Sequence, residues 1–512
     1  MNHKGETIGS LWSRLEGLKR PFMDRAERYA ALTLPRILLP EGTDTNAVGQ
    51  THDFQSIGAV AVNHVVNKLA LAMFSPAKPF FRIGLDNATK KQLATSGVTE
   101  TEAGAKLAVV EKDAADELDV LGQRPKLYSA LRHLVVVGNT VVKFDDEVIR
   151  QYGLGEFCVK RNKRGEVHTL VVREHIKFDE LEEDVQALLG KQYNADTMVN
   201  HYTLICRQII NRKPHYVQRV AIDEIELLDK KYQGRWLEHE CPWRVLTWDL
   251  ADKADYASSL VEEYQGDLEA LSMLAESVVT GGVLGAEFRY LINPTMNTSA
   301  EDFNKSKNGS AMAGMKGDID VITGGNPEAL KVADAVAEKY ERRVSRAFLL
   351  NSAVTRDAER VTAEEIRMTA MELETSFGGT YTALASTFQA PVAYWLLDRI
   401  DSNILGTKLR VVVLTGLDAL SRNGELENFR LAVADLAAFA TVPPMILQRF
   451  KFDAIAEFIG SRRGVDFKAF LKSDEEIARE QAQAIAQQAA LAGQTAQAET
   501  AGTNEANQGI AP

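Results

Sequence analysis

The sequence has little cysteine and no secretion signal. Its three cysteines, Cys158, Cys206 and Cys241, include no CxxC spacing. They are too few and too scattered for a disulfide framework, which indicates a reducing compartment. The N-terminal stretch MNHKGETIGSLWSRLEGLKRPF lacks the apolar core of a signal peptide. No window approaches the ~18 apolar residues that span a bilayer. We therefore expect a soluble protein with no membrane partner.

Motifs typical of enzymes are missing as well. The chain has no GxxxxGK[ST] phosphate-binding loop and no GxGxxG between a strand and a helix, which argues against a nucleotide-driven motor. HExxH and GxSxG are also absent. His239 and Cys241 lie close together in the sequence, but a structural zinc site needs four ligands at recognisable spacing, and the others are not evident. We expect no catalytic residue, no metal and no cofactor.

Positive charge is in deficit. The chain carries 71 acidic and 59 basic residues, giving a formal net charge of −12 at pH 7. A free-standing, sequence-specific nucleic-acid binder normally has a basic face, and this balance argues against one. It does not exclude a protein that guides DNA without gripping it.

The 512 residues leave room for several domains, and the 45% apolar content supports folded cores. Apolar residues recur with helical periodicity in several stretches, and β-rich runs separated by turn residues fill the region between them. The fold class predicted is α+β, predominantly helical. The predicted helices cover residues 8–31, 52–74, about 101–137, 256–280, 326–350, 362–400, 424–473 and 474–492, and the β-rich region covers about 139–249, with further short strands at PFFRIGL and KLRVVVLTGL.

The helix that begins near Tyr256 carries a second pattern. Glu262, Glu269 and Glu276 are seven residues apart and fall on a face other than the apolar stripe. We expect Gly281 and Gly282 to end the helix.

The stretch RDAERVTAEEIRMTAMELETSFGG contains a helix start and a weak point. Thr362 and Glu365 form a capping box. The Thr362 hydroxyl can accept a hydrogen bond from a backbone N–H of the first helical turn, and the Glu365 side chain can reach back to the backbone N–H of Thr362. Residues 351–361 therefore lie outside the helix as a loop. Gly378 and Gly379 follow mid-helix, where each glycine costs roughly 0.5 to 1 kcal/mol relative to alanine. We expect a bend there, used either for a change of direction or for close helix packing.

Several stretches resemble the portal proteins, the head-to-tail connectors of short-tailed bacteriophages. They are RAERYAALTLPRILLPEG, HDFQSIGAVAVNHVVNKLALAMF, VEEYQGDLEAL and RAFLLNSAVTRDAERVTAEEIRMTAMELETSFGGTYTALASTFQAPV. The resemblance spans roughly residues 10 to 400 in consistent order. One departure is that Ala257 and Ser258 stand where portals of this group often carry a Gly-Arg pair.

The resemblance implies a ring of about twelve subunits around a central channel, at one vertex of the capsid. A portal subunit has a wing, a stem, a clip and a crown. Mapped onto the predicted elements, these parts are an N-terminal wing at 1–197, a β-rich clip at 198–250, a stem helix at 251–282, a wing return at 283–420, a helical crown at 421–492 and a mobile tail at 493–512.

Within the wing return, the resemblance makes 351–361 the tunnel loop that narrows the channel. It carries Arg356 and Arg360 beside Asp357 and Glu359. Repeated around a ring, the arginines would form a positive collar that touches DNA phosphates without reading bases. Salt bridges between subunits are the alternative role for them. In the same ring, the face of Glu262, Glu269 and Glu276 would point either into the lumen or toward basic residues of a neighbouring subunit, and the sequence alone leaves both open.

The implied function is a conduit for packaging and ejecting the genome, and a platform for the terminase and the tail. The implied partners are copies of itself, double-stranded DNA without sequence specificity, a terminase, a tail adaptor, and capsid and scaffolding proteins. The protein would assemble in the host cytoplasm and reside in the virion. A virion or tail-adaptor component without a DNA channel is the alternative.

Overall fold

The computed structural model divides the chain into two compact units, Met1–Leu417 and Asp418–Pro512. The predicted crown and tail lie outside the residues that it describes, apart from three isolated positions, and the fold below is that of the first unit. The described residues are 6–40, 53–75, 79–84, 100–189, 193–295, 298–311, 313–323, 327–350, 363–400, 410–413, 433–434 and 455.

The N-terminal helices form where apolar periodicity predicts them. Thr7 caps α1, because its hydroxyl accepts a hydrogen bond from the backbone N–H of Ser10. α2 is the most buried of these helices, and its apolar side chains pack into the main hydrophobic core together with α5, α11 and α12. The helices are α1 (Ile8–Leu32), α2 (Ile57–Met73), α4 (Glu100–Val120) and α5 (Arg124–Val137), with a 3-10 turn at Pro35–Ile37 after α1.

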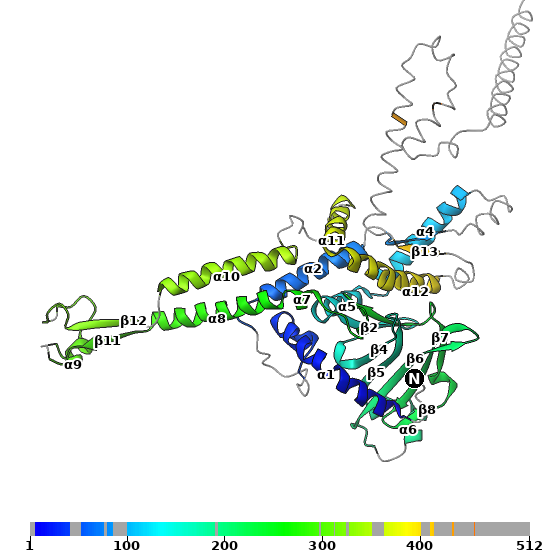
Figure 1. Ribbon diagram of the computed structural model, residues 1–512, viewed down its shortest axis with the longest axis horizontal. Helices are drawn as coiled ribbons and strands as arrows, with labels where there is room; N and C mark the ends of the chain where they lie inside the picture. Colours follow the sequence, from blue (N-terminus) through cyan, green and yellow to red (C-terminus); the bar gives the residue numbers. More distant parts are fainter. Residues whose placement is uncertain are drawn as a thin grey trace, which may run out of the picture. The chain divides into compact units, whose positions relative to one another are not determined.

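Two antiparallel sheets occupy the middle of the chain (Figure 1). The smaller has the order β10-β2-β3, and the larger has the order β4-β5-β6-β7-β8, with β9 paired to β7. The short helix α6 (Glu183–Leu189) lies between β5 and β6. The strands are β2 (Asn139–Phe144), β3 (Ile149–Tyr152), β4 (Phe157–Arg161), β5 (Val167–Lys177), β6 (Met198–Ile210), β7 (Lys213–Ile222), β8 (Ile225–Leu227), β9 (Gly234–Leu237) and β10 (Trp243–Thr247).

The strand pairing crosses the boundary predicted at residue 198. β6 begins at Met198 and pairs with β5, while β10 pairs with β2. Some backbone hydrogen bonds of residues 198–250 are therefore made with strands that precede this boundary, whereas β7, β8 and β9 pair within it. Strand periodicity reveals the strands, but not which strand is the partner.

A two-helix arm follows. The long antiparallel helices α8 and α10 lie side by side, and a small tip built from β11, α9 and β12 joins them (Figure 1). The predicted single helix from Tyr256 is broken at Tyr264 into a short turn and a long helix. The elements are α7 (Leu260–Glu263), α8 (Gln265–Ala286), β11 (Phe288–Ile292), α9 (Ala300–Lys305), β12 (Ile319–Thr323) and α10 (Pro327–Ala347).

The prediction that Gly281 and Gly282 end the helix is wrong, since α8 continues to Ala286. The structure gives Gly281 another role. A Cβ atom there would lie 2.4 Å from Cδ2 of Leu330 on α10, so the missing side chain allows the two helices of the arm to approach closely.

The last described elements return to the core. α11 (Ala363–Leu384), a π-helical turn (Ala385–Gln389) and α12 (Ala390–Ile400) form the long helical region predicted for 362–400. The strand predicted in KLRVVVLTGL is β13 (Arg410–Val413), and it pairs antiparallel with β1 (Phe81–Gly84), the strand predicted in PFFRIGL. This pairing joins segments more than three hundred residues apart in the sequence.

Gly138 fixes the junction between α5 and β2. Its φ of 75° is left-handed, and its N–H caps α5 by donating to the carbonyl of Leu134. A Cβ atom on Gly138 would lie 2.6 Å from the carbonyl oxygen of Ala257 and 2.7 Å from that of Ser258. Only glycine satisfies both the dihedral angle and the close approach.

We therefore expect Gly138→Ala to destabilise the fold by more than the ~1 to 2 kcal/mol of a left-handed non-glycine residue, because a clash with backbone is added. Gly17→Ala is the matched control, since a Cβ at that helical position of α1 meets no described atom within 4 Å. Thermal unfolding followed by circular dichroism measures both. Equal melting temperatures for the two variants would contradict this account.

Candidate functional site

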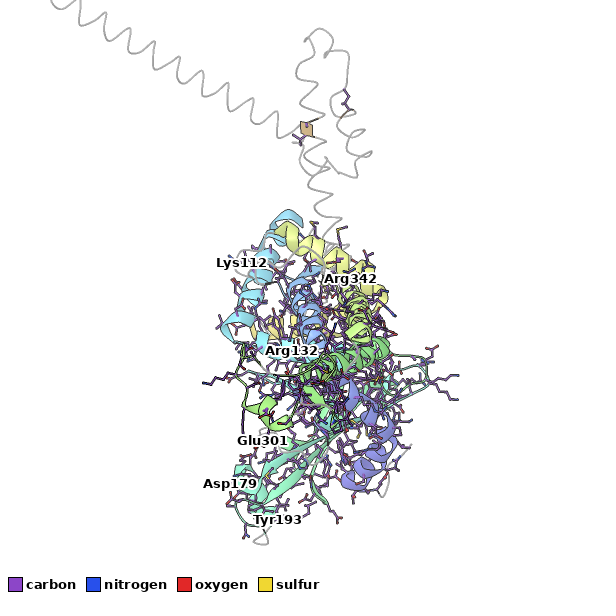
Figure 2. All side chains as sticks on the ribbon, turned by 90° about the vertical axis from the view of Figure 1, so that its left-hand side faces the viewer. Lys112, Arg132, Asp179, Tyr193, Glu301 and Arg342 are labelled. Carbon is purple, nitrogen blue, oxygen red and sulfur yellow. The ribbon has the colours of Figure 1, made fainter. Side chains whose placement is uncertain are left out.

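The arm is held together at both ends. Near its base, Arg343 of α10 forms a 3.0 Å ion pair with Asp267 of α8. Near its tip, Leu330 packs on Gly281. Figure 2 looks at the molecule from the side of the tip, with Glu301 of α9 and Arg342 of α10 labelled. The two contacts set the antiparallel register of the helices within one chain.

Much of the apolar surface of α8 has no partner in the part of the chain that the structure describes. Met273, Val279 and Val283 are 62%, 54% and 60% exposed. By length and composition alone α8 could cross a membrane, which the sequence analysis did not anticipate, and only 17% of its most apolar window is buried. Exposed apolar residues on one helix mark an interaction surface.

The three predicted glutamates lie on two helices. Glu262 lies on α7, where it forms a 3.3 Å ion pair with Arg25 of α1. Burial and the Glu262 carboxylate raise the pKa of Tyr29, also on α1, to about 12. Glu269 and Glu276 lie on α8, beyond the break at Tyr264. Glu262 thus has a partner within its own chain, and the acidic face stays a prediction.

The ends of the segment 351–362 are both tied to α2. Leu349, just before the segment, has φ 57°, and its carbonyl oxygen lies 3.1 Å from Lys68 Nζ and 3.0 Å from His64 Nε2. Lys68 Nζ also lies 2.8 Å from a carboxylate oxygen of Glu372 on α11, just after the segment. We call Lys68, His64, Leu349 and Glu372 the α2 anchor.

Burial gives the anchor its strength. Lys68 is only 5% exposed and contacts both Leu349 and Glu372, and a hydrogen-bonded charge pair is worth most where water is excluded. Burial and then the neighbouring Lys68 ammonium lower the pKa of His64. His64 is thereby favoured in the neutral form, with one ring nitrogen able to donate to the Leu349 carbonyl.

Comparison with known proteins adds an independent finding. Residues 5–471 match the family described as bacteriophage head to tail connecting protein. The chain belongs to this family. Among its relatives are the portal protein of Pseudomonas phage phiKMV, 30% identical over 498 residues that cover 95% of each chain, and that of Enterobacteria phage SP6, 29% identical over 495 residues that cover 94% of this chain and 93% of the relative.

A solved structure, the neck of an empty GTA particle, is also similar, with 11% identity, a TM-score of 0.40, and coverage of 80% of this chain and 90% of that one. Membership of the connector family confirms the resemblance stated from the sequence. It also confirms that the chain is a structural protein of the phage particle and not an enzyme.

The departure from the usual Gly-Arg pair of these connectors lies at a buried junction. Ala257 is fully buried, and its backbone N–H and carbonyl both bond the side chain of Asn139, at 2.9 and 2.8 Å. Together with the close approach of Gly138, these bonds fix the entry to α7. The junction is therefore completed by backbone and by Asn139, without an arginine at position 258.

The predicted tunnel-loop residues Arg356 and Arg360 lie outside the described residues. So do Thr362 and the side chain of Glu365, which were predicted to form the helix cap. Gly378 is described, and its φ of 42° and ψ of −110° interrupt the helical backbone of α11. A Cβ atom at Gly378 or Gly379 would meet no described atom within 4 Å, so close packing within this part of one chain does not require them.

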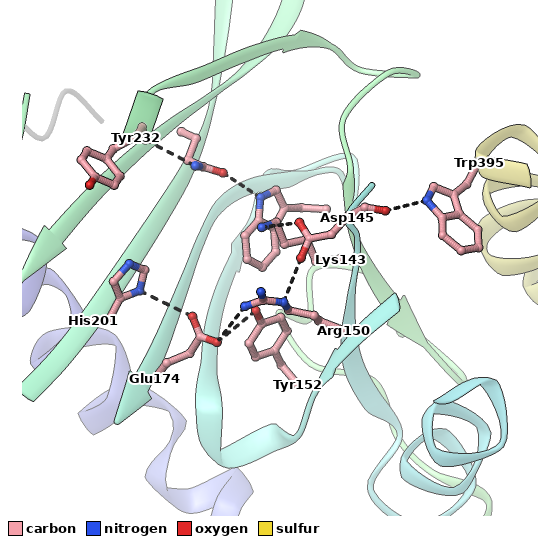
Figure 3. A network of polar contacts seen from close by, with 10 residues as sticks. Lys143, Asp145, Arg150, Tyr152, Glu174, His201, Tyr232 and Trp395 are labelled. Carbon is pink, nitrogen blue, oxygen red and sulfur yellow. Dashed lines mark hydrogen bonds and ion pairs between the residues drawn. The ribbon is translucent and has the colours of Figure 1, made fainter. Parts of the chain in front are cut away.

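A polar network joins the two sheets (Figure 3). Glu174 of β5 accepts a 3.2 Å hydrogen bond from the Tyr152 hydroxyl of β3, and it lies 3.5 Å from His201 of β6 and 4.0 Å from Arg150. Burial works against the charged form of Glu174, but its contacts with His201, Tyr152 and Arg150 outweigh it and lower the pKa. The carboxylate is therefore a fixed charge between the sheets.

Arg150 carries the network further. It forms a 2.9 Å ion pair with Asp145, whose backbone carbonyl accepts a 2.7 Å hydrogen bond from Trp395 of α12 (Figure 3). The network thus connects both sheets with the helical region that contains α11 and α12. Asp145 Oδ2 and His201 Nδ1 lie within ion-pair distance of Arg150 and Glu174, although neither atom has a hydrogen-bond partner of good geometry. The ion pairs between strands and the link to α12 are typical of a structural role.

Sequence reasoning missed the α2 anchor. The available signal was a lone lysine inside the apolar stretch HVVNKLALAMF, because a lysine on a buried helix face needs a partner. The partners themselves are about three hundred residues away and could not be identified from the sequence.

We expect Lys68→Ala to loosen both flanks of the segment 351–362, because it removes one of the two groups that bond the Leu349 carbonyl, His64 being the other, and leaves Glu372 without its ion pair. The loss of a buried charged hydrogen bond is worth roughly 1.5 to 3 kcal/mol. Amide hydrogen exchange in 345–350 and 366–374 should accelerate on the order of tenfold or more. The control is Asn67→Ala, an exposed position on the same helix. Unchanged exchange would show that the anchor does not hold these ends.

Proposed function

We propose that this connector is a portal: a ring of about twelve copies around an axial channel, through which double-stranded DNA enters and leaves the capsid. The observation that carries the proposal is the arm, whose exposed apolar side chains have no partner within the described chain. Apolar side chains concentrated on one helix are stable in water only when another surface covers them. Copies of the same chain, arranged around an axis, provide that surface.

The parts of a portal fit the described elements with one change from the sequence-based assignment. The arm helices α8 and α10 suit the stem, and the tip formed by β11, α9 and β12 suits the clip, in place of residues 198–250. The two sheets with α1 and α5 suit the wing. The assignment of 421–492 as the crown rests on the resemblance to portals.

The segment 351–361 remains our candidate for the tunnel loop. The α2 anchor supports this role, since it ties both flanks of the segment to the buried core. Arginine collars at Arg356 and Arg360 would contact phosphates without reading bases, a mode that weakens with added salt. The net charge of −12 per chain would oppose tight adhesion of DNA to other parts of the ring.

The remaining partners follow from the portal role. A terminase would supply the energy for packaging, a tail adaptor would bind after packaging, and capsid and scaffolding proteins would surround the ring at one vertex. No membrane partner is proposed, because the apolar surface of α8 suits the neighbouring subunit. A virion component without a channel is the competing function.

The first test is the assembly state. We expect the purified chain to form closed rings of about twelve copies with an axial channel, and to hydrolyse no ATP. Mass photometry and negative-stain imaging measure the first two properties, and a phosphate-release assay the third. A stable monomer would overturn the portal function, and rings without an axial opening would favour the competing function.

The second test concerns the arginines. We expect the double variant Arg356→Ala, Arg360→Ala to assemble normally and to retain packaged DNA less well, with the difference from wild type shrinking as salt rises. Arg164→Ala with Arg235→Ala, two exposed arginines of the sheet region, is the control. Loss of assembly in the first variant alone would instead assign Arg356 and Arg360 to salt bridges between subunits.

A further inference from the structure

We infer that α8 of one copy packs against α10 of the next copy in one defined register. The surface on α8 consists of Glu269, Glu276 and Val283, which we call the acidic flank. The surface on α10 consists of Val332, Lys339 and Arg346, which we call the basic flank. The inference rests on the proposed ring and specifies which residues join its subunits.

The acidic flank lies away from the helix partner in the same chain. Its members are seven residues apart, about two turns, so they share one side of α8. The contacts with α10 come from other positions, Asp267 and Gly281. Val283 is 60% exposed and Glu276 is exposed, while Glu269 is half-buried beside Gln265. Because α8 contains no lysine or arginine, the negative charges of its acidic residues have no positive side chain on the same helix to balance them.

The basic flank has the same spacing on α10. Val332 is 64% exposed, and Lys339 and Arg346 are exposed. The nearby cations of α10 are matched in their own chain, since Arg343 pairs with Asp267, Arg342 with Glu338, and Lys331 with Glu328. Among the described residues, no carboxylate lies within ion-pair distance of Lys339 or Arg346.

An antiparallel alignment of the two flanks satisfies all three positions together. When Glu269 faces Arg346, equal seven-residue spacing places Glu276 opposite Lys339 and Val283 opposite Val332. Two ion pairs and one apolar contact therefore share one register. Since Arg343 faces Asp267 within a chain, the neighbouring arm is displaced from this internal register by about five residues, roughly 7.5 Å along the helix axis.

This contact is heterologous, since a different surface of each copy takes part. Repetition of such a contact forms a closed ring when the rotation between copies closes. Paired charges at the edge of an apolar contact fix register and partner choice more than they add affinity. A second copy is the occupant favoured here, because its acidic flank matches the basic flank in sign, spacing and apolar position.

Disulfide trapping tests the register directly. Val283→Cys and Val332→Cys, combined in one chain, should give a covalent ladder up to the full ring under mild oxidation, resolved on a non-reducing gel. Neither single variant should cross-link, but a mixture of the two should yield dimers, because the contact joins different surfaces. The wild type controls for Cys158, Cys206 and Cys241. Rings that form normally without cross-links would overturn the inference while leaving the portal function intact.

Charge exchange tests the ion pairs. Glu269→Arg with Glu276→Lys should lose the ring population at a concentration where the wild type is assembled, and so should Lys339→Glu with Arg346→Glu. The four substitutions together should restore rings, which separates a lost contact from a lost fold. Normal assembly of both double variants would overturn the inference. So would a Lys339→Glu, Arg346→Glu variant that assembles normally and only loses DNA, since its basic flank would then face the channel.

Discussion

The arm depends on a surface that a single chain does not bury. α8 packs mainly against α10 along its length, and Met273, Val279 and Val283 remain exposed. Removing apolar surface from water is the largest favourable contribution to folding and association. The proposed ring would remove this apolar surface of the arm from water. The family to which the chain belongs, connectors between head and tail, is consistent with that proposal.

The main hydrophobic core contains α2. This helix is buried, and from it Lys68 and His64 reach the chain on both sides of 351–362. The segment proposed as the tunnel loop is therefore tied at both flanks to a helix inside the core.

The polar network between the sheets has a related role. Glu174, Arg150 and Asp145 link strands of both sheets with Trp395 of α12. Buried polar contacts of this kind require specific geometry, because an unsatisfied partner is costly. They define how the sheets and the helical region fit together, whereas the apolar core alone tolerates several arrangements.

Patterns of local origin could be predicted from the sequence. The helices of 8–31, 52–74 and 362–400 and the strands of the middle region follow from apolar periodicity, and the family follows from stretches such as RAERYAALTLPRILLPEG. Predictions that depended on distant neighbours were wrong or incomplete. Glycine is a common helix stop, which suggests an end at Gly281, but Leu330 fills the space beside it. Glu262 shares the seven-residue spacing of Glu269, but Tyr264 separates the two helices.

By itself, then, the sequence determined where helices and strands form, that no disulfide framework holds them, and to which family the chain belongs. The tertiary structure decided which strands pair, which glycine serves packing, and which buried lysine holds the flanks of 351–362. The physical reason is the separation in sequence over which each interaction acts. Periodicity and capping depend on residues a few positions apart, so the sequence shows them directly. Burial and ion pairing join residues such as Lys68 and Glu372, which only the folded chain brings together.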